Sequence, residues 1–142
     1  MTEVYGDPMA LTPKNAHQLA GELRALADET RLQMLELLAD HPELCVCDLE
    51  HALGISQSKA SRHLRYLHNA RLLDDRREGV WIYYRLADDL EPPLRDILAK
   101  AREALDPEAA STLHERLEHW LAVKTCSAGG SCVPNSRSRV LS

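Results

Sequence analysis

Two cysteines separated by a single residue, Cys45 and Cys47, have the residue type and spacing needed to hold a soft ion. Thiolates are the ligands that soft, thiol-seeking metals and metalloids prefer. Directly after the pair, the pattern predicts two short helices, at 46–52 and 56–70, joined by a tight turn. An ion that moved the backbone at the pair would also move these helices. The placement therefore predicts a regulatory switch and not catalysis.

The other two of the four cysteines, Cys126 and Cys132, lie near the C-terminal end. No stretch approaches the roughly 18 consecutive apolar residues of a membrane span, and the first residues lack the basic-then-apolar pattern of a signal peptide. We therefore expect a cytoplasmic protein without a membrane partner. Because the cytosol is reducing, we expect the cysteines as free thiols or ligands and not as a disulfide framework.

The charge is distributed unevenly along the chain. Its formal net charge is −5, yet residues 56–85 hold seven basic and only three acidic residues. An acidic body with one basic face discourages stray contact while it lets that face meet phosphates. This distribution predicts site-specific binding to double-stranded DNA.

The apolar periodicity predicts a mainly α fold with a β-hairpin wing, that is, a winged helix-turn-helix. At 142 residues, the chain has about the length of one domain. We divide it into a flexible arm (1–13), the winged domain with its N- and C-terminal dimerisation helices (14–122) and a flexible tail that contains cysteines (123–142). The helix caps that we expect are Asn15, either Asp28 or Thr30, and Ser56. Further helices are expected after Pro92 and from Pro107.

In the expected helix-turn-helix, Gly54 makes the turn, and Ala60, Leu64 and Leu67 form the buried stripe of the second helix. The wing strands are expected at Leu72–Arg77 and Val80–Leu86. His63, Trp81 and Tyr84 are expected to pack against the body. The residues expected to contact DNA lie on the outer face of the second helix and on the wing: Gln57, Ser58, Lys59, Ser61, Arg62, Arg65, Arg76 and Arg77.

The opening and closing helices carry more apolar surface than one small winged domain needs. They can pack on one another in a monomer or on a second copy of the chain. We favour a homodimer, since two-fold symmetry gives a reader with one recognition helix more affinity and a defined half-site spacing.

Four segments together resemble the ArsR/SmtB family of metal-responsive repressors, and among them the arsenite and antimonite sensors. They lie between Leu23 and Leu105 and read Ala27-Asp28-Glu29-Thr30-Arg31-Leu32, Glu43-Leu44-Cys45-Val46-Cys47-Asp48-Leu49, Ser56-Gln57-Ser58-Lys59-Ala60-Ser61-Arg62-His63-Leu64 and Asp75-Arg76-Arg77-Glu78-Gly79-Val80-Trp81-Ile82-Tyr83-Tyr84-Arg85-Leu86. The resemblance implies a homodimeric repressor that sits on operator DNA and leaves it when As(III) or Sb(III) binds, with no organic cofactor.

The arsenite sensors of this family often have a third cysteine three residues after the second, where this chain has Glu50. Trivalent arsenic usually takes three thiolates, so the candidates for the third position are Cys126 or Cys132 from the tail of either subunit, a cellular thiol, or a hydroxide left on the arsenic. Residues two apart on a regular helix point roughly 200° away from each other. We therefore expect arsenic to bind where the first helical turn is frayed or to unwind it.

Other readings of the cysteine pair are two small apolar residues at a helix start, a redox switch, or a sensor of soft divalent metals. A thiol enzyme is disfavoured because no glycine loop that could hold an anion adjoins either pair. A zinc site after the wing is also disfavoured, since residues 87–104 contain no histidine. His114, Glu118 and His119 are expected to form a solvated face.

Overall fold

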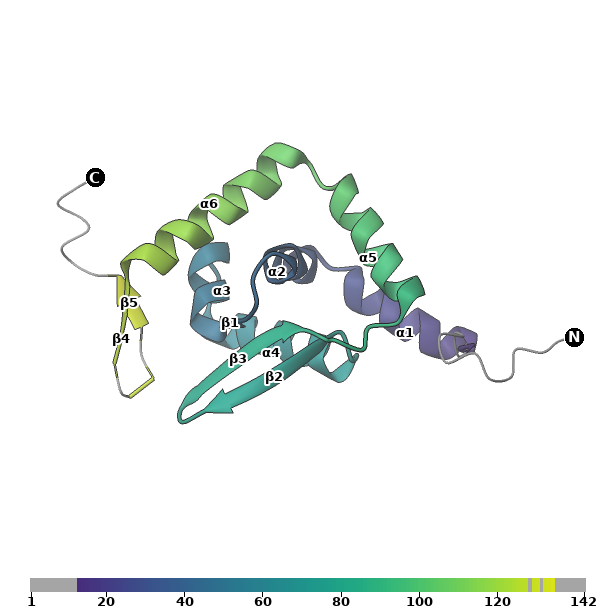
Figure 1. Ribbon diagram of the computed structural model, residues 1–142, viewed down its shortest axis with the longest axis horizontal. Coiled ribbons are helices and arrows are strands. Elements are labelled where there is room, and N and C mark those ends of the chain that lie inside the picture. Colours follow the sequence, from purple (N-terminus) through teal and green to yellow (C-terminus); the bar gives the residue numbers. More distant parts are fainter. Residues whose placement is uncertain (1–12, 128, 131, 135–142) are drawn as a thin grey trace, which may run out of the picture.

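The structure is a computed structural model that describes residues 13–127, 129–130 and 132–134. Within these residues the chain forms a mainly helical fold with a β-hairpin (Figure 1), as the sequence predicts. The elements are α1 (Ala16–Leu26), α2 (Glu29–Ala39), β1 (Leu44–Cys45), α3 (Val46–Leu53), α4 (Gln57–Asn69), β2 (Leu73–Glu78), β3 (Trp81–Leu86), α5 (Pro92–Ala104), α6 (Pro107–Val123), β4 (Lys124–Cys126) and β5 (Cys132–Pro134). Most of the predicted N-terminal arm lies outside the described residues.

Four helices begin at side chains that cap them, and at α6 the cap is Asp106, which accepts from the Ala109 N–H at 3.1 Å. The side-chain oxygens of Asn15, Asp28 and Ser56 each accept a hydrogen bond from the backbone N–H three residues further on, at 2.8, 3.0 and 3.1 Å. These bonds satisfy N–H groups that have no partner inside a helix. The predicted caps are confirmed, with Asp28 and not Thr30 beginning α2.

The turn between α3 and α4 depends on Gly54, whose φ of +66° lies in the left-handed region that favours glycine. Beyond the turn, Ala60, Leu64 and Leu67 of α4 are fully buried, as predicted. Their burial turns the opposite face of α4 outward. The helix-turn-helix is therefore present and presents the polar side of α4 to solvent.

The wing is the antiparallel pair of β2 and β3, which turns at Gly79 with φ +61°. A third strand, β1, pairs antiparallel with β3, so that Leu44 faces Tyr84 and Cys45 faces Tyr83. The sequence did not predict β1, because two residues carry no periodicity. As a result, Cys45 belongs to the same hydrogen-bonded sheet as the wing.

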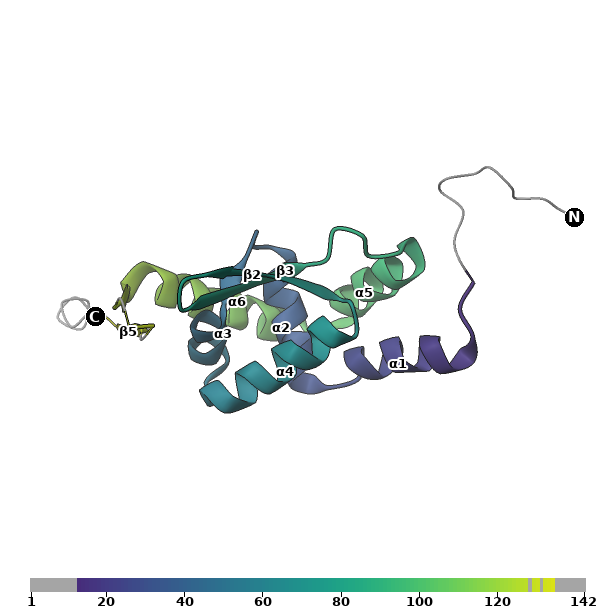
Figure 2. The same ribbon diagram turned by 90° about the horizontal axis from the view of Figure 1, so that it is seen from below.

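The core is centred on α2, whose Met34, Leu35, Leu37 and Leu38 are at most 1% exposed. In Figure 1, α5 and α6 form an arch over α2, and the wing projects from the other side. In the turned view, α4 runs beside the wing (Figure 2). No helix in the described part of the chain has the length and apolar character needed to cross a membrane.

The predicted apolar stripe of α1 is only partly buried. Ala25 and Leu26 are in the core, whereas Leu19 and Leu23 are 40% and 39% exposed. Ile97 of α5 is 36% exposed, and α5 lies at the same end of the molecule as α1 (Figures 1 and 2). This end therefore presents apolar side chains that one chain does not cover.

At the opposite end, the chain leaves α6 directly into a short hairpin of β4 and β5. A disulfide joins Cys126 to Cys132, which face each other across the two strands. The expectation of free thiols is therefore wrong for this pair, and that of a flexible tail is wrong for the two strands. Sequence reasoning had no means to anticipate that the two segments would pair.

Candidate functional site

The helix α3 begins between the two thiols of interest. Cys45 is the residue that precedes the first helical turn, with extended backbone angles (φ −87°, ψ 169°), and Cys47 lies inside the helix. The 200° separation of residues on a regular helix therefore does not apply. The two thiols hydrogen-bond to each other without any unwinding. The expectation that arsenic binds at a frayed or unwound first turn stays a prediction.

The hydrogen bond makes the two thiols unequal. The Cys47 S–H donates to Cys45, and this is the main cause that lowers the pKa of the Cys45 thiol below its ordinary value. The same bond, together with burial, raises the pKa of Cys47.

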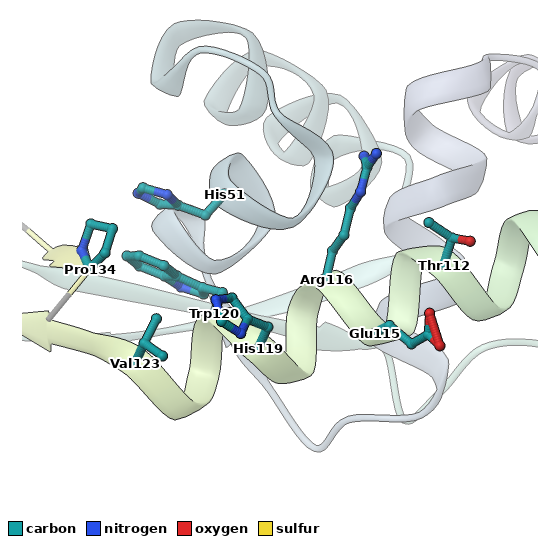
Figure 3. Close-up of a pocket in the computed structure, with 8 residues that line it drawn as sticks. All are labelled: His51, Thr112, Glu115, Arg116, His119, Trp120, Val123 and Pro134. Carbon is teal, nitrogen blue, oxygen red and sulfur yellow. The ribbon is translucent and has the colours of Figure 1, made fainter. Parts of the chain in front are cut away.

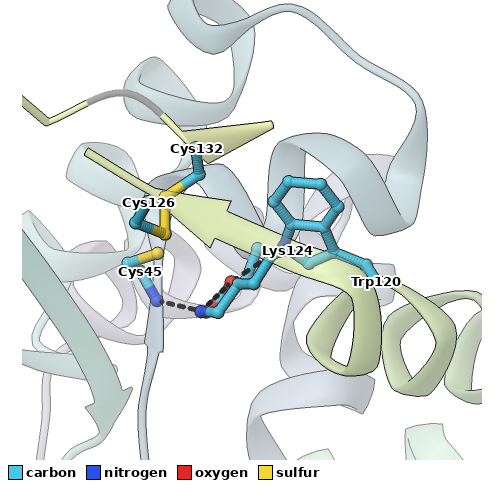
Figure 4. Close-up of a disulfide and its surroundings, with 6 residues drawn as sticks. Cys45, Trp120, Lys124, Cys126 and Cys132 are labelled. Carbon is cyan, nitrogen blue, oxygen red and sulfur yellow. Dashed lines mark hydrogen bonds and ion pairs between the residues drawn. A yellow bond between two sulfur atoms is a disulfide. The ribbon is translucent and has the colours of Figure 1, made fainter. Parts of the chain in front are cut away.

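A buried carboxylate, Asp48, fixes the backbone at the pair. Its Oδ2 accepts from the Cys45 N–H at 3.0 Å. Its Oδ1 accepts from Trp120 Nε1 at 2.9 Å and from Lys124 Nζ at 2.8 Å. Figure 4 shows Trp120 and Lys124 reaching toward Cys45 from the end of α6. The thiol pair is thus tied to the point where α6 becomes the tail.

Sequence reasoning missed this role of Asp48. A local signal was present, since an acidic residue at the third position of a helix commonly accepts from the N–H of the cap residue. The other two donors, Trp120 in α6 and Lys124 in β4, lie 72 and 76 residues away and had no such signal. The burial of Asp48, which is 2% exposed, follows from these three bonds.

Both thiols open into one cleft of about 330 Å³. Four parts of the chain form its walls: the start of α3, the outer face of α4, the tip of the wing and the tail hairpin. The lining residues are Cys45, Val46, Cys47, Glu50, His51, Gln57, Ser61, Val80, Trp81, Ile82, Gly130 and Cys132. Glu50, which stands where a third cysteine was considered, therefore lines the same cleft as the thiols.

The polar side chains of α4 lie on the solvent-facing side of the helix, as the sequence predicts for a binding surface. Gln57, Ser58, Lys59, Arg62 and Arg65 are exposed, and Ser61 is half-buried. Lys59, Arg62 and Arg65 form no salt bridge to any residue that the structure describes. Their charge is therefore available to a polyanion.

The two wing arginines differ from each other. Arg77 is exposed and has no salt-bridge partner among the described residues. Arg76 forms salt bridges with Glu43 and, at 2.8 Å, with Glu78, and its guanidinium lies 4.6 Å from the ring centre of Tyr83. Arg76 thus links the wing to the segment before Cys45, a role that its sequence position did not reveal.

His63 packs inward, which confirms the expectation for it. Its Nδ1 lies 3.2 Å from Nη1 of the buried Arg31, whose Nε donates to the Ala25 carbonyl at 2.7 Å. Burial lowers the pKa of His63 below its ordinary value. Tyr84 is buried and Trp81 packs against the core, also as expected.

A second group of ligand-type side chains joins α2 to the first half of α6. Glu36, Asp40 and His114 bring their polar atoms within 4.8 Å of one another. Arg102 donates to Glu36 at 2.8 Å and to Asp40 at 3.1 Å, and His114 lies 2.7 Å from Glu36. His114 is therefore not part of a solvated face as expected. The carboxylates already have a cation between them.

Beside α6 lies another cavity, of about 450 Å³, lined by His51, Thr112, Glu115, Arg116, His119, Trp120, Val123 and Pro134 (Figure 3). His51 stacks flat on Trp120, with ring centres 3.6 Å apart. This stack packs α3 on α6 behind the thiol pair. It holds in place the indole that donates to Asp48.

Comparison with known proteins agrees with this arrangement. The model of the bacterial regulatory protein family arsR matches residues 28–75. The arsenic resistance transcriptional regulator ArsR1 of Pseudomonas putida is 46% identical over 90 residues, which are 61% of this chain and 70% of that protein. The chain belongs to the ArsR family. The arsenical resistance operon repressor of Escherichia coli is 55% identical over 64 residues, which are 45% of this chain and 55% of the repressor.

Solved structures of ArsR-type regulators share the fold. The antimony-specific transcriptional repressor AntR has a TM-score of 0.54 and 31% identity, over 71% of this chain and 88% of AntR. The homodimeric winged helix-turn-helix DNA-binding domain of Mb0332 from Mycobacterium bovis has a TM-score of 0.54 and 32% identity, over 68% and 94% of the two chains. The two relatives and the two solved structures are transcriptional regulators or DNA-binding domains by name.

Proposed function

We propose that the chain is an arsenic-responsive repressor, which binds operator DNA as a homodimer and dissociates when As(III) or Sb(III) binds Cys45 and Cys47. The observation that carries this proposal is the shared cleft. In it, two thiols that already face each other stand against residues of α4 and of the wing, which are the elements proposed to grip DNA.

The donor set suits a trivalent metalloid. Arsenic and antimony in this state are soft and favour sulfur over oxygen or nitrogen. Cys45 is favoured as the thiolate, and Cys47 lies within hydrogen-bonding reach of it. The arsenic-resistance names of the two relatives and the antimony specificity of AntR support the same class of effector. No organic cofactor is proposed.

Two short routes connect the thiols to the DNA-binding elements. Gln57 and Ser61 of α4 line the same cleft as the thiols. An ion bound in the cleft would therefore contact the recognition helix and shift its position. The pairing of Cys45 with Tyr83 joins the thiol backbone to the wing. A coupling free energy of about 1–3 kcal/mol would lower DNA affinity by roughly 5- to 150-fold.

On DNA, we assign base contacts to the start of α4 and phosphate contacts to the flanking cations. Gln57 suits adenine, and Lys59 or Arg62 suits guanine. Arg65 and Arg77 are assigned to the backbone, since they are exposed and have no salt-bridge partner among the described residues. Ser58 and Ser61 complete the base-reading set, and Arg76 would give up its bonds to Glu43 and Glu78 to reach DNA.

We propose a homodimer formed through α1 and α5. Leu19, Leu23 and Ile97 supply exposed apolar surface there, and the Mb0332 domain with the same fold is homodimeric. Residues 14–122 would make up the winged domain with its dimerisation helices, and residues 123–142 the appended cysteine tail. Since operator DNA is the proposed partner, the proposed place of action is the cytoplasm.

The central test is release of DNA measured by fluorescence anisotropy. A labelled duplex taken from the region upstream of the chain's own gene is titrated first with protein and then with arsenite, antimonite, cadmium, zinc or peroxide. Wild type is expected to dissociate with arsenite and antimonite, and Cys45→Ser/Cys47→Ser is expected to stay bound. Arg62→Ala should weaken binding with or without arsenite, while Arg116→Ala, at an exposed position of α6, should not.

The outcomes separate the candidate functions. An unchanged arsenite response in Cys45→Ser/Cys47→Ser would sink the proposal. Release by peroxide alone would instead identify a redox switch, which the tail disulfide favours as the second candidate. Release by cadmium alone would identify a sensor of soft divalent metals.

A further inference from the structure

The disulfide of the tail hairpin lies against the thiol pair. Of its two cysteines, Cys132 is buried, at 9% exposure, and lines the cleft of Cys45 and Cys47, whereas Cys126 is exposed and does not line it. Figure 4 shows the disulfide beside Cys45. Three of the four cysteine residues of the chain thus line one cleft.

Two contacts hold the hairpin over the cleft from within the same chain. Lys124, the first residue of β4, donates to Asp48 next to Cys47. At the other end, Gly130 packs against Val80 of the wing so closely that an added Cβ would lie 3.0 Å from a methyl carbon of Val80. Gly130 also has φ +90°, which favours glycine. These two contacts therefore fix both ends of the hairpin relative to the cleft.

We propose that Cys132, once its bond to Cys126 is reduced, supplies the third thiolate to the Cys45/Cys47 cleft of its own chain, so that the disulfide gates metalloid binding. This inference rests on the proposed function, which leaves the third ligand open. A disulfide sulfur has no negative charge to donate, and the thiolate is the form that ligates. In the disulfide form, the cleft offers two thiols and in the reduced form three.

The chemistry balances without a change in the oxidation state of arsenic. A cellular dithiol reduces the tail disulfide by passing it two electrons and two protons, which leaves two cysteine thiols and an oxidised dithiol. Arsenous acid, As(OH)₃, then condenses with the thiols of Cys45, Cys47 and Cys132. Three As–O bonds are exchanged for three As–S bonds, and three water molecules leave.

The experiment compares two forms of the full-length wild type in oxygen-free buffer. One has the Cys126–Cys132 bond and two free thiols per chain, verified by thiol titration and peptide mapping, and the other has four free thiols. Arsenite is the probe, and arsenic X-ray absorption counts its sulfur neighbours. We expect three sulfurs in the reduced form and two in the disulfide form. Affinity should fall at least about tenfold in the disulfide form, the lower end of the loss seen when only an outer-shell partner of a metal ligand is removed.

The matched variants are Cys126→Ser and Cys126→Ser/Cys132→Ser. Neither can form the tail disulfide, so both have the same opened hairpin and differ in one sulfur. Cys126→Ser is expected to coordinate arsenic through three sulfurs without prior reduction, and the double variant through two. Three sulfurs in the double variant, or equal affinity in both wild-type forms, would overturn the gate.

Failure of the gate is distinguishable from failure of the proposed function. If the disulfide form releases DNA with arsenite as readily as the reduced form, while Cys45→Ser/Cys47→Ser does not respond, only the gate is wrong. If Cys45→Ser/Cys47→Ser responds fully, the sensor assignment itself is wrong.

Discussion

The two halves of α6 each contact a buried carboxylate, but the two carboxylates have different surroundings. In the first half, His114 meets Glu36 of α2, with Arg102 bound to the same carboxylate. At its other end, Trp120 of α6 and Lys124, the residue that follows the helix, meet Asp48 of α3, beside the thiols of Cys45 and Cys47.

The difference shows which group is prepared for a soft ion. Glu36, Asp40 and His114, here called the Glu36 group, have the hard ligands of a metal site. The negative charge of the two carboxylates is, however, already compensated by Arg102. The Asp48 carboxylate instead holds the backbone at the thiol pair, and both cysteines line a cleft that a ligand can enter. Clustering of ligand-type side chains is thus a poorer guide to a site than the partners those side chains already have.

The largest expected effect comes from Asp48→Ala. It would leave the Lys124 cation, the indole N–H and the Cys45 N–H without their acceptor. We expect a loss of about 3 kcal/mol in the free energy of unfolding, at the low end for a broken buried pair because Lys124 is partly exposed. Urea unfolding at fixed protein concentration measures it. Asp88→Ala, at an exposed carboxylate, should stay within about 0.5 kcal/mol of wild type.

Glu36→Ala is expected to cost less, about 2 kcal/mol, because Arg102 and His114 can turn toward Asp40. Burial opposes ionisation of Glu36, but the hydrogen bonds from Arg102 and His114 outweigh it and lower the pKa of Glu36. The stabilisation from this group is therefore complete above the ordinary value of 4.5 and is lost as pH falls through the lowered pKa.

This pH dependence has its own control. Glu36→Gln retains acceptors for Arg102 but cannot titrate, so its urea midpoint should change less than that of wild type between about pH 5 and pH 3. Equal pH dependence in the two proteins would mean that Glu36 is not a source of the acid sensitivity.

Trp120→Phe isolates one bond of the Asp48 group. The ring can still stack on His51, while the hydrogen bond to Asp48 is lost. We expect a loss of about 1 kcal/mol in the free energy of unfolding, the usual net value of one buried hydrogen bond. A loss as large as that of Asp48→Ala would instead assign the main role to the indole and not to the carboxylate.

The smallest change in stability is expected when the Glu36 group is tested as a zinc site. A ligand at 100 times its dissociation constant stabilises a protein by about 2.7 kcal/mol. Any stabilisation by zinc should come from the cysteines and be equal, within about 0.5 kcal/mol, in wild type and His114→Gln. Thermal unfolding with and without zinc measures it. A clearly smaller zinc effect in His114→Gln would make the Glu36 group a metal site after all.

The parts of the fold that local sequence determines were predictable. The caps at Asn15, Asp28 and Ser56, the turn at Gly54 and the wing around Gly79 each depend on residues within a few positions of one another. The thiol pair could be identified in the same way, since its spacing is local.

Features that join distant segments could not be predicted. β1 has only two residues and is a strand because β3 passes beside it. The role of Asp48 depends on donors that α6 brings from the far end of the chain. α1 shows the reverse case, since the sequence predicted excess apolar surface on this helix, and Leu19 and Leu23 are indeed left partly uncovered by the single chain.

α6 ends at Val123 and β4 starts at Lys124, so the tail hairpin follows the helix without a linker. This connection decides whether the arsenite site depends on thiols from other molecules. A donor that is joined to its site through a short connection in the same chain acts at a high effective concentration, of millimolar order or above. The fold thus sets the effective concentration of the Cys132 sulfur at the cleft. With the gate open, the third sulfur would come from the same chain, so the arsenite site would need neither a second copy of the chain nor a cellular thiol to complete it.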